Sequence, residues 1–209
     1  MKLLLFLFFS FNCLYSQSSF EGLIKYKTSI EYTDAFDNKI KKGVLNKYGD
    51  SLTIFYSKEG FFKRVFHNTG YRGNDFVIYN PQLGTLNHKY NGVKSINVDT
   101  TINNSLSLEK ITKVENEKIM DLDCHCYEYE AKSIRTSDLV VLKYCFSSLT
   151  PFLNCNLFSK HKDFFMSDFF KLANRPYLKL EMKFKFNTIT FTAYNIIESK
   201  LDANTFKVE

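Results

Sequence analysis

The chain has 209 residues and a formal net charge of +6 at pH 7, which suits one domain with a buried core. It contains 22 Phe and 13 Tyr but no Trp, an aromatic content that fits a thick core or an apolar cavity. The lysines alternate with apolar residues instead of clustering, which is typical of a solvated sheet face. We therefore expect no nucleic-acid partner.

Residues 1–16 have the three parts of a secretory signal peptide. A charged start at Lys2 precedes an apolar run over residues 3–11, and small and polar residues follow at 16–19. The run is too short for a membrane span, which needs roughly 20 apolar residues. The rest of the chain, 17–209, is expected to form a single β-rich domain outside the cytoplasm, soluble or in peripheral contact with a membrane.

The end of this segment has two interpretations. Cleavage before Gln17 gives a periplasmic or secreted protein, whereas lipid attachment at Cys13 gives an outer-membrane lipoprotein. Lipid attachment prefers small residues just before the cysteine, and Phe11 and Asn12 fit badly there. The sequence therefore favours simple export.

Alternation of apolar and polar residues recurs along the chain and predicts half-buried β-strands. The expected strands are 20–32, 43–48, 52–56, 61–66, 76–79, 86–90, 93–101, 106–114, 124–132, 139–146, 178–186, one after 188, and a short one at 206–208. For the last hairpin, a turn at Asn187-Thr188 would pair Phe184 with Phe191. The pattern predicts a mainly β fold, a large curved antiparallel sheet or half-open β-barrel that hides its edges.

One segment breaks this alternation, between residues 159 and 174. Phe165, Phe169 and Leu172 follow the i, i+4, i+7 spacing of an amphipathic helix, and Pro176 ends it soon after. This helix either plugs the open sheet or forms a lid over an apolar cavity. The two alternatives differ in whether space remains beneath it.

Four cysteines remain after cleavage, and an even number in an exported chain favours disulfides. The predicted pairs are Cys126–Cys145 and Cys124–Cys155. The first pair follows from one hairpin register, which also places Glu128 opposite Lys143 on the outer face. Cys124 shares that face and reaches Cys155 through the following loop.

Catalytic and metal chemistry is disfavoured by the spacing of the remaining candidates. A zinc site would use Cys124, His125, Cys126 and Cys145. On a strand, however, His125 points away from both neighbouring cysteines, which also disfavours a Cys–His nucleophile. The other histidines, His67, His88 and His161, lie in separate segments without ligand spacing. No catalytic or phosphate-binding motif is present, so we expect no enzyme, metal or cofactor.

Short motifs resemble those of small exported proteins common in Bacteroidota. The motifs are Phe20-Glu21-Gly22-Leu23-Ile24-Lys25-Tyr26-Lys27, Lys118-Ile119 with Cys124 and Tyr127, Tyr144 with Phe146, Thr190 with Thr192-Ala193 and Ile196, and a final Phe206. Those families are similar to the periplasmic lipoprotein carrier (LolA-like) fold. The resemblance implies a half-open β-barrel with helices over its mouth and an apolar cavity for acyl chains. One related group carries a Gly-Leu-Pro-Gly-Leu-Ile box, which this chain lacks, and no functional residue carries over.

The expected function is therefore an exported binding protein whose apolar cavity binds or carries a lipid or lipidated partner. The candidate lining residues are aromatic: Tyr26, Tyr127, Tyr129, Tyr144, Phe165, Phe169, Phe184 and Phe191. The alternative is a non-catalytic envelope protein, structural or interacting, with a filled core. Function inferred by analogy of fold is a weak argument, so the space beneath the helix must decide between them.

Overall fold

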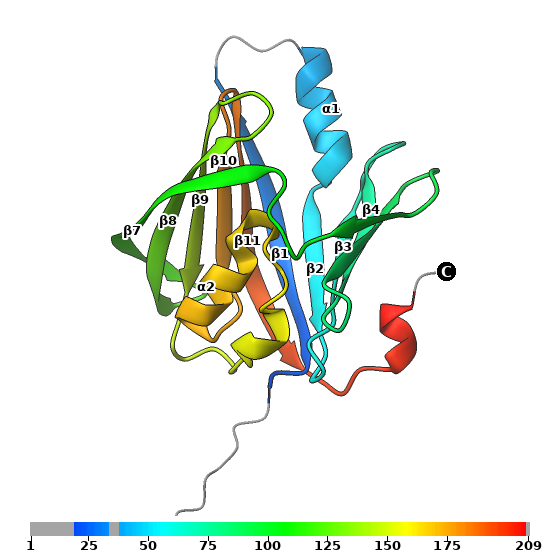
Figure 1. Cartoon of the computed structure of the whole chain (residues 1–209), viewed down its shortest axis with the longest axis vertical. Coiled ribbons are helices and arrows are strands. Elements are labelled where there is room, and N and C mark those ends of the chain that lie inside the picture. Colours follow the sequence, from blue (N-terminus) through cyan, green and yellow to red (C-terminus); the bar gives the residue numbers. More distant parts are fainter. Residues whose placement is uncertain (1–18, 34–37, 208–209) are drawn as a thin grey trace, which may run out of the picture.

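The computed structural model describes residues 19–33 and 38–207. The predicted signal peptide (1–16), Cys13 and the bond before Gln17 lie outside the described residues. Within them, eleven strands form one antiparallel sheet in the order β6-β5-β4-β3-β2-β1-β11-β10-β9-β8-β7, which is not closed. The strands are β1 (Gly22–Tyr32), β2 (Ser51–Tyr56), β3 (Phe62–His67), β4 (Asn74–Asn80), β5 (Thr85–Tyr90), β6 (Ile96–Asp99), β7 (Leu106–Ile119), β8 (Leu122–Ser133), β9 (Leu139–Phe146), β10 (Lys179–Lys183) and β11 (Asn187–Glu198). The expected mainly β fold with one large curved sheet is confirmed (Figure 1).

The first and last strands of the chain, β1 and β11, pair with each other near the centre of the sheet. Strand β1 pairs with β2 on one side and with β11 on the other, in a register that runs from Gly22–Glu198 to Tyr32–Asn187. Apolar residues on one face of each strand point into the concavity. Ile24 and Tyr26, for example, are fully buried. The chain thus builds two meanders, β1–β6 and β7–β11, which join through the β1–β11 pair and curl toward each other.

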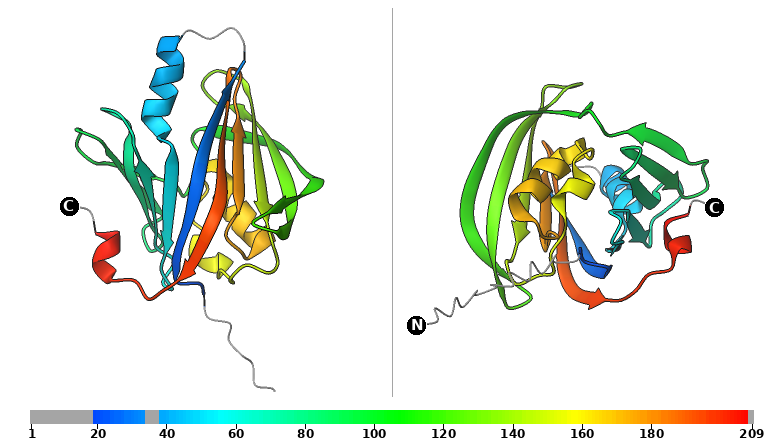
Figure 2. Two further views of the ribbon diagram at one scale, coloured as in Figure 1. Left: turned by 180° about the vertical axis from the view of Figure 1, so that it is seen from behind. Right: turned by 60° about the horizontal axis from the view of Figure 1, so that its bottom comes forward.

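The connection between β9 and β10 lies inside the curl of the sheet. It contains the 3-10 helices η1 (Cys155–Phe158) and η2 (Asp163–Phe165) and the helix α2 (Met166–Ala173). Figure 2 shows this segment surrounded by the strands when the molecule is seen from below. The rings of Phe169 and Tyr144 stack at 4.7 Å, and those of Phe165 and Tyr129 at 6.0 Å. The predicted helix over the open sheet is therefore present.

Helix α2 is shorter than the predicted span of 159–174. Phe164 and Phe165 adopt left-handed backbone angles (φ 51° and 56°), which place the helix start at Met166. Its buried face is Met166, Phe169, Phe170 and Ala173, whereas the predicted Leu172 is 39% exposed. Asn174 ends the helix in a left-handed conformation ahead of Pro176.

The segment expected as a strand at 43–48 is instead part of the helix α1 (Asn38–Tyr48). Ile40, Val44 and Tyr48 have the spacing of a helix face, and a pattern read from residue 43 onward misses it. Gly49 follows with φ +66°, and its N–H donates to the carbonyl of Leu45, a common helix C-terminus. Helix α1 has no fully buried residue and stands beside the mouth of the concavity (Figure 1).

The last hairpin has a different register from the one expected. Leu180, not Phe184, pairs with Phe191, and Met182 pairs with Ile189. The turn closes earlier, where the N–H of Phe184 donates to the carbonyl of Asn187. The shift conserves parity, so the apolar face stays inward. The expected strand at 206–208 is also wrong where it is described, because Phe206 ends the 3-10 helix η3 (Ala203–Phe206).

Candidate functional site

A cavity of about 160 Å³ lies between the concave face of the sheet and the η2–α2 segment. We call it the inner cavity. Its wall is mostly apolar and aromatic. It is lined by Lys47, Tyr48, Leu52, Arg64, Phe66, Asn74, Val77, Leu86, His88, Tyr90, Tyr144, Asp163, Phe164, Tyr177, Leu180, Met182 and Phe191. Both meanders and the inserted segment therefore contribute to one site.

The wall of the inner cavity contains a single arginine, Arg64 on β3. It shares the inward face of the strand with Phe62 and Phe66, because side chains alternate along a strand. Its guanidinium carbon lies 5.0 Å from the centre of the Phe62 ring, and Nη2 lies 3.7 Å from the Sδ of Met166. Nε is buried and has no hydrogen-bond partner among the described residues. The Arg64 guanidinium has therefore exchanged hydrogen bonds to water for contacts with weak partners.

The nearest groups do not neutralise Arg64 by a close ion pair. Among residues 19–33 and 38–207, no carboxylate oxygen lies within 4.0 Å of the guanidinium. Asp163 is close enough to feel the charge, but burial dominates and raises the pKa of this carboxyl. The Tyr177 hydroxyl is buried without a hydrogen bond of good geometry, although Arg64 acts to lower its pKa, against the larger effect of burial.

Two histidines on this side of the sheet are held neutral. Burial lowers the pKa of His88, in the cavity wall, to about 4, and the charges of Arg64 and Lys47 act in the same direction. His161 is fully buried against the rings of Tyr79 (4.8 Å) and Phe62 (5.3 Å), which also contact each other. Neither of its ring nitrogens has a partner among the described residues, and burial holds its pKa well below the usual range.

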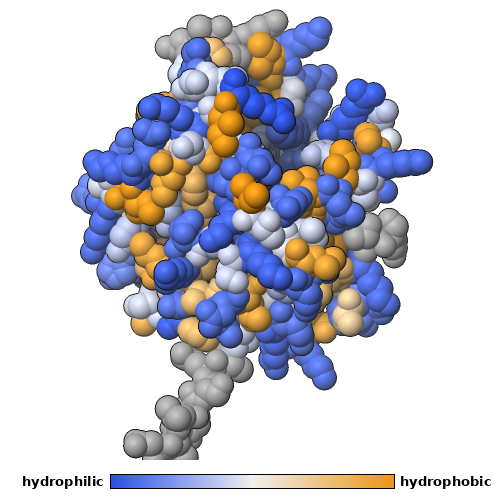
Figure 3. All heavy atoms as spheres, viewed as in Figure 1, coloured by the Kyte–Doolittle hydropathy of each residue, from blue (hydrophilic) through white to orange (hydrophobic). Residues whose placement is uncertain are grey.

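A larger cleft of about 660 Å³ opens above the inner cavity, and the two share Lys47, Tyr90 and Phe164. We call it the outer cleft. Its lining combines apolar residues from β7–β9 and the β10–β11 turn with three cations at the rim. The apolar set is Leu106, Leu139, Val140, Phe164, Phe184 and Phe186, and the cations are Lys47, Arg135 and Lys185. Hydrophobic residues also gather on the β7–β9 side of the face seen in Figure 3. Because the two spaces share these residues, the outer cleft leads to the inner cavity.

The structure separates the eight predicted lining residues into three groups. Tyr144 and Phe191 line the inner cavity, and Phe184 lines the outer cleft from the β10–β11 turn. The other five pack beside the site without lining it: Tyr26, Tyr127, Tyr129, Phe165 and Phe169. Tyr26 is fully buried, and its hydroxyl donates to the carbonyl of Tyr177 at 2.7 Å.

Sequence reasoning missed the polar part of the site, above all Arg64. Its signal is visible in retrospect in the strand Phe-Lys-Arg-Val-Phe-His, where an arginine occupies the apolar position between two phenylalanines. Asp163 and Tyr177 carry no comparable signal. Their position depends on how the inserted segment folds back over the sheet.

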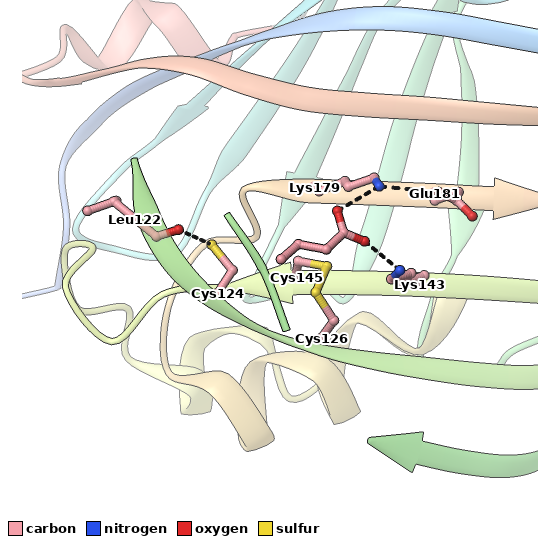
Figure 4. A network of polar contacts seen from close by, with 8 residues as sticks. Leu122, Cys124, Cys126, Lys143, Cys145, Lys179 and Glu181 are labelled. Atoms are coloured by element: carbon pink, nitrogen blue, oxygen red, sulfur yellow. Dashed lines mark hydrogen bonds and ion pairs between the residues drawn. A yellow bond between two sulfur atoms is a disulfide. The ribbon is translucent and has the colours of Figure 1, made fainter. Parts of the chain in front are cut away.

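The convex face of the sheet carries a second polar cluster, around the disulfide Cys126–Cys145 (Figure 4). The predicted register is confirmed, with Cys126 opposite Cys145 and Glu128 opposite Lys143. Lys143 nevertheless forms its ion pair with Glu117 of β7, which also pairs with Lys179 at 2.9 Å. The bonds from both lysines lower the pKa of Glu117 despite the opposing effect of burial.

Cys124 and Cys155 are free thiols, so the second predicted disulfide is not formed in this structure. Cys124 shares the convex face with Cys126 and donates to the carbonyl of Leu122 at 3.4 Å. Cys155 begins η1, in the segment that covers the concave face. The sheet itself separates the two sulfurs.

The same cluster holds the metal-like grouping among the described residues, Glu117 with the sulfurs of Cys126 and Cys145 within 4.8 Å. Those two sulfurs are bonded to each other and are not thiolate ligands. His125 is exposed and contacts the ring of Phe146 at 5.9 Å. We therefore interpret this cluster as structural.

No protein-family model matches the chain, and no curated protein matches it significantly. Among the described residues, no helix combines the length and apolar character needed to cross a bilayer. The disulfide fits an oxidising compartment outside the cytoplasm. The site must therefore be interpreted from its own geometry.

Proposed function

We propose that this protein is an exported, non-catalytic binding protein that takes up a lipid, a lipidated partner or a similar hydrophobic molecule. The observation that carries the proposal is the space between the inserted segment and the sheet, open to an outer cleft. Concave, mostly apolar sites with a few polar groups are the usual form of small-molecule sites. The resemblance of short sequence motifs to LolA-like half-barrel families supports the same ligand class.

The size of the space limits how a ligand binds. At about 160 Å³ the inner cavity is smaller than the roughly 300–1,000 Å³ typical of pockets for drug-sized ligands. One end of a ligand fits inside, and the remainder lies in the outer cleft. We therefore propose partial insertion instead of full enclosure of a lipid.

The second candidate function is an envelope interaction or structural protein with a filled core. It is favoured by the tight packing of the inserted segment, in which Phe165, Phe169 and Phe170 are nearly or completely buried. In this alternative the cavity is a packing defect, and a partner binds the outer surface.

Native mass spectrometry of the gently purified protein separates these candidates. We expect a co-purified hydrophobic adduct on the wild-type protein and its loss in Val77→Phe, which adds a ring to the cavity wall. Val98→Phe is the matched control, because Val98 lies on β6, is 40% exposed and does not line the cavity. An adduct-free wild-type protein that also fails to bind an added ten-carbon alcohol would leave the filled-core candidate.

A further inference from the structure

The inner cavity contains a charge that an apolar ligand does not explain. A carrier of purely hydrophobic molecules gains nothing from a half-buried guanidinium, whose desolvation costs free energy. Arg64 offers five N–H donors in a fixed plane. The described residues provide it with a methionine sulfur, the face of an aromatic ring and the neighbouring Tyr177 hydroxyl, which are weak partners for a charge. The wall of the space that a ligand would enter therefore contains an unused donor, the Nε–H of Arg64.

We propose that Arg64 binds the acidic group of an anionic amphiphile, a carboxylate or phosphate on an apolar chain. This inference rests on the proposed function and names its ligand class. Arginine matches both groups because its planar fork donates two parallel hydrogen bonds to two oxygens. The acidic group enters the inner cavity, and the apolar chain extends along the apolar residues of the outer cleft.

The charges around the site favour this orientation over the reverse one. With the chain inward, Arg64 would lose its remaining exposure and gain no counter-charge. The rim cations are exposed to water, and Lys185 is already 3.4 Å from Asp138. Exposed pairs of this kind contribute little. The buried cation is thus the stronger anchor for an anion.

Asp163 is the group that opposes the proposal, because it places a second acid near Arg64. Its carboxylate is not within ion-pair distance, so the guanidinium keeps free donors. A bound anion and Asp163 would repel each other. Removing the charge of Asp163 should therefore strengthen anion binding.

The test uses four ten-carbon probes that differ at one end: decanoate, decyl phosphate, decanol and decyltrimethylammonium. Binding is measured by calorimetry on the disulfide-bonded protein, below the concentrations at which the probes aggregate. We expect decanoate or decyl phosphate to bind at least about tenfold more tightly than decanol, the gain typical of a charge-assisted hydrogen bond. The tighter of the two anions distinguishes a fatty-acid-like ligand from a phospholipid-like one.

Variants assign the preference to Arg64. Arg64→Met should retain decanol binding and lose the anion preference, Arg64→Lys should keep part of it, and Asp163→Asn should increase it. Lys63→Met is the matched control, because Lys63 is the next residue on the same strand but faces outward over the Phe76 ring. It removes the same charge and should leave the preference unchanged.

The possible results distinguish a failure of this inference from a failure of the proposed function on which it rests. Equal binding of decanol and the anions, or an anion preference that survives in a folded Arg64→Met, overturns the role of Arg64 but leaves a hydrophobic binding protein. Failure of all four probes to bind overturns the proposed function as well. If Arg64→Met does not fold, the changes in anion preference in Arg64→Lys and Asp163→Asn still test the role of Arg64.

Discussion

The two faces of the sheet differ in how their buried polar and charged groups are partnered. On the convex face, Glu117 is paired with Lys143 and Lys179, and the cluster packs over a disulfide. On the concave face, Arg64 and His161 have polar atoms without partners among the described residues. Buried polar groups are normally satisfied, so the convex cluster is accounted for by structure. Arg64, which lines the inner cavity, calls for another explanation, and the proposed ligand would provide one.

The largest expected effect tests the convex face as a structural device. Replacing both Cys126 and Cys145 by alanine should lower the free energy of unfolding by about 3 kcal/mol, because the crosslink restricts the unfolded chain across 19 residues. Denaturant unfolding with and without a reductant measures it. Cys155→Ser is the control, since this thiol is free and only partly buried, and it should change stability much less.

The next effect tests the concave face through pH. His88 and His161 have lowered pKa values in the folded state, so below about pH 6.5 the unfolded chain binds protons that the folded chain does not. Stability is therefore complete above that pH and falls as the pH drops toward 4. Each histidine contributes a slope of up to about 1.4 kcal/mol per pH unit.

The variant His161→Leu should flatten this acid dependence by about half, since one of the two histidines is removed. Thermal unfolding from pH 7.5 to 4.5 measures the slope. His125→Leu is the matched control, because His125 is exposed on β8. An acid slope that is the same in His161→Leu and the wild type would show that His161 is protonated in the folded protein or hydrogen-bonded by an unseen partner.

A smaller effect tests the ion pairs of the convex face. Glu117→Gln leaves Lys143 without its carboxylate and Lys179 with Glu181 alone, at 3.4 Å, and these lysines are 19% and 17% exposed. We expect a loss of about 1–2 kcal/mol after allowing for partial solvent screening. The lowered pKa of Glu117 means that its contribution is present near neutral pH and disappears as the pH falls below about 4.5. Glu109→Gln, in an exposed pair with Lys132, should cost much less.

The two faces also differ in how well the sequence predicts them. The convex register followed from local alternation, because one pairing satisfied sulfur and charge together in Cys126–Cys145 and Glu128–Lys143. The concave cavity does not follow from local alternation. Asp163 and Tyr177 reach it from a connection whose path over the sheet is set by tertiary packing. The sequence does not predict helix α1 for a different, local reason. Its apolar spacing begins at Ile40, before the stretch that resembles a strand.

The smallest expected effect is the sharpest test of the contrast between the faces. Without ligand, Arg64→Met should leave stability unchanged or raise it by about 1 kcal/mol, because an apolar chain of similar length replaces an incompletely partnered charge. Glu117→Gln, by contrast, should destabilise. A substitution that improves folding while abolishing the preference for anionic probes would mark Arg64 as a residue kept for binding at a cost in stability. If Arg64→Met instead destabilises as much as Glu117→Gln, then Asp163, Tyr177 and the Phe62 ring already provide sufficient partners. In that case Arg64 has a structural role on the concave face, as Glu117 and its lysines have on the convex face.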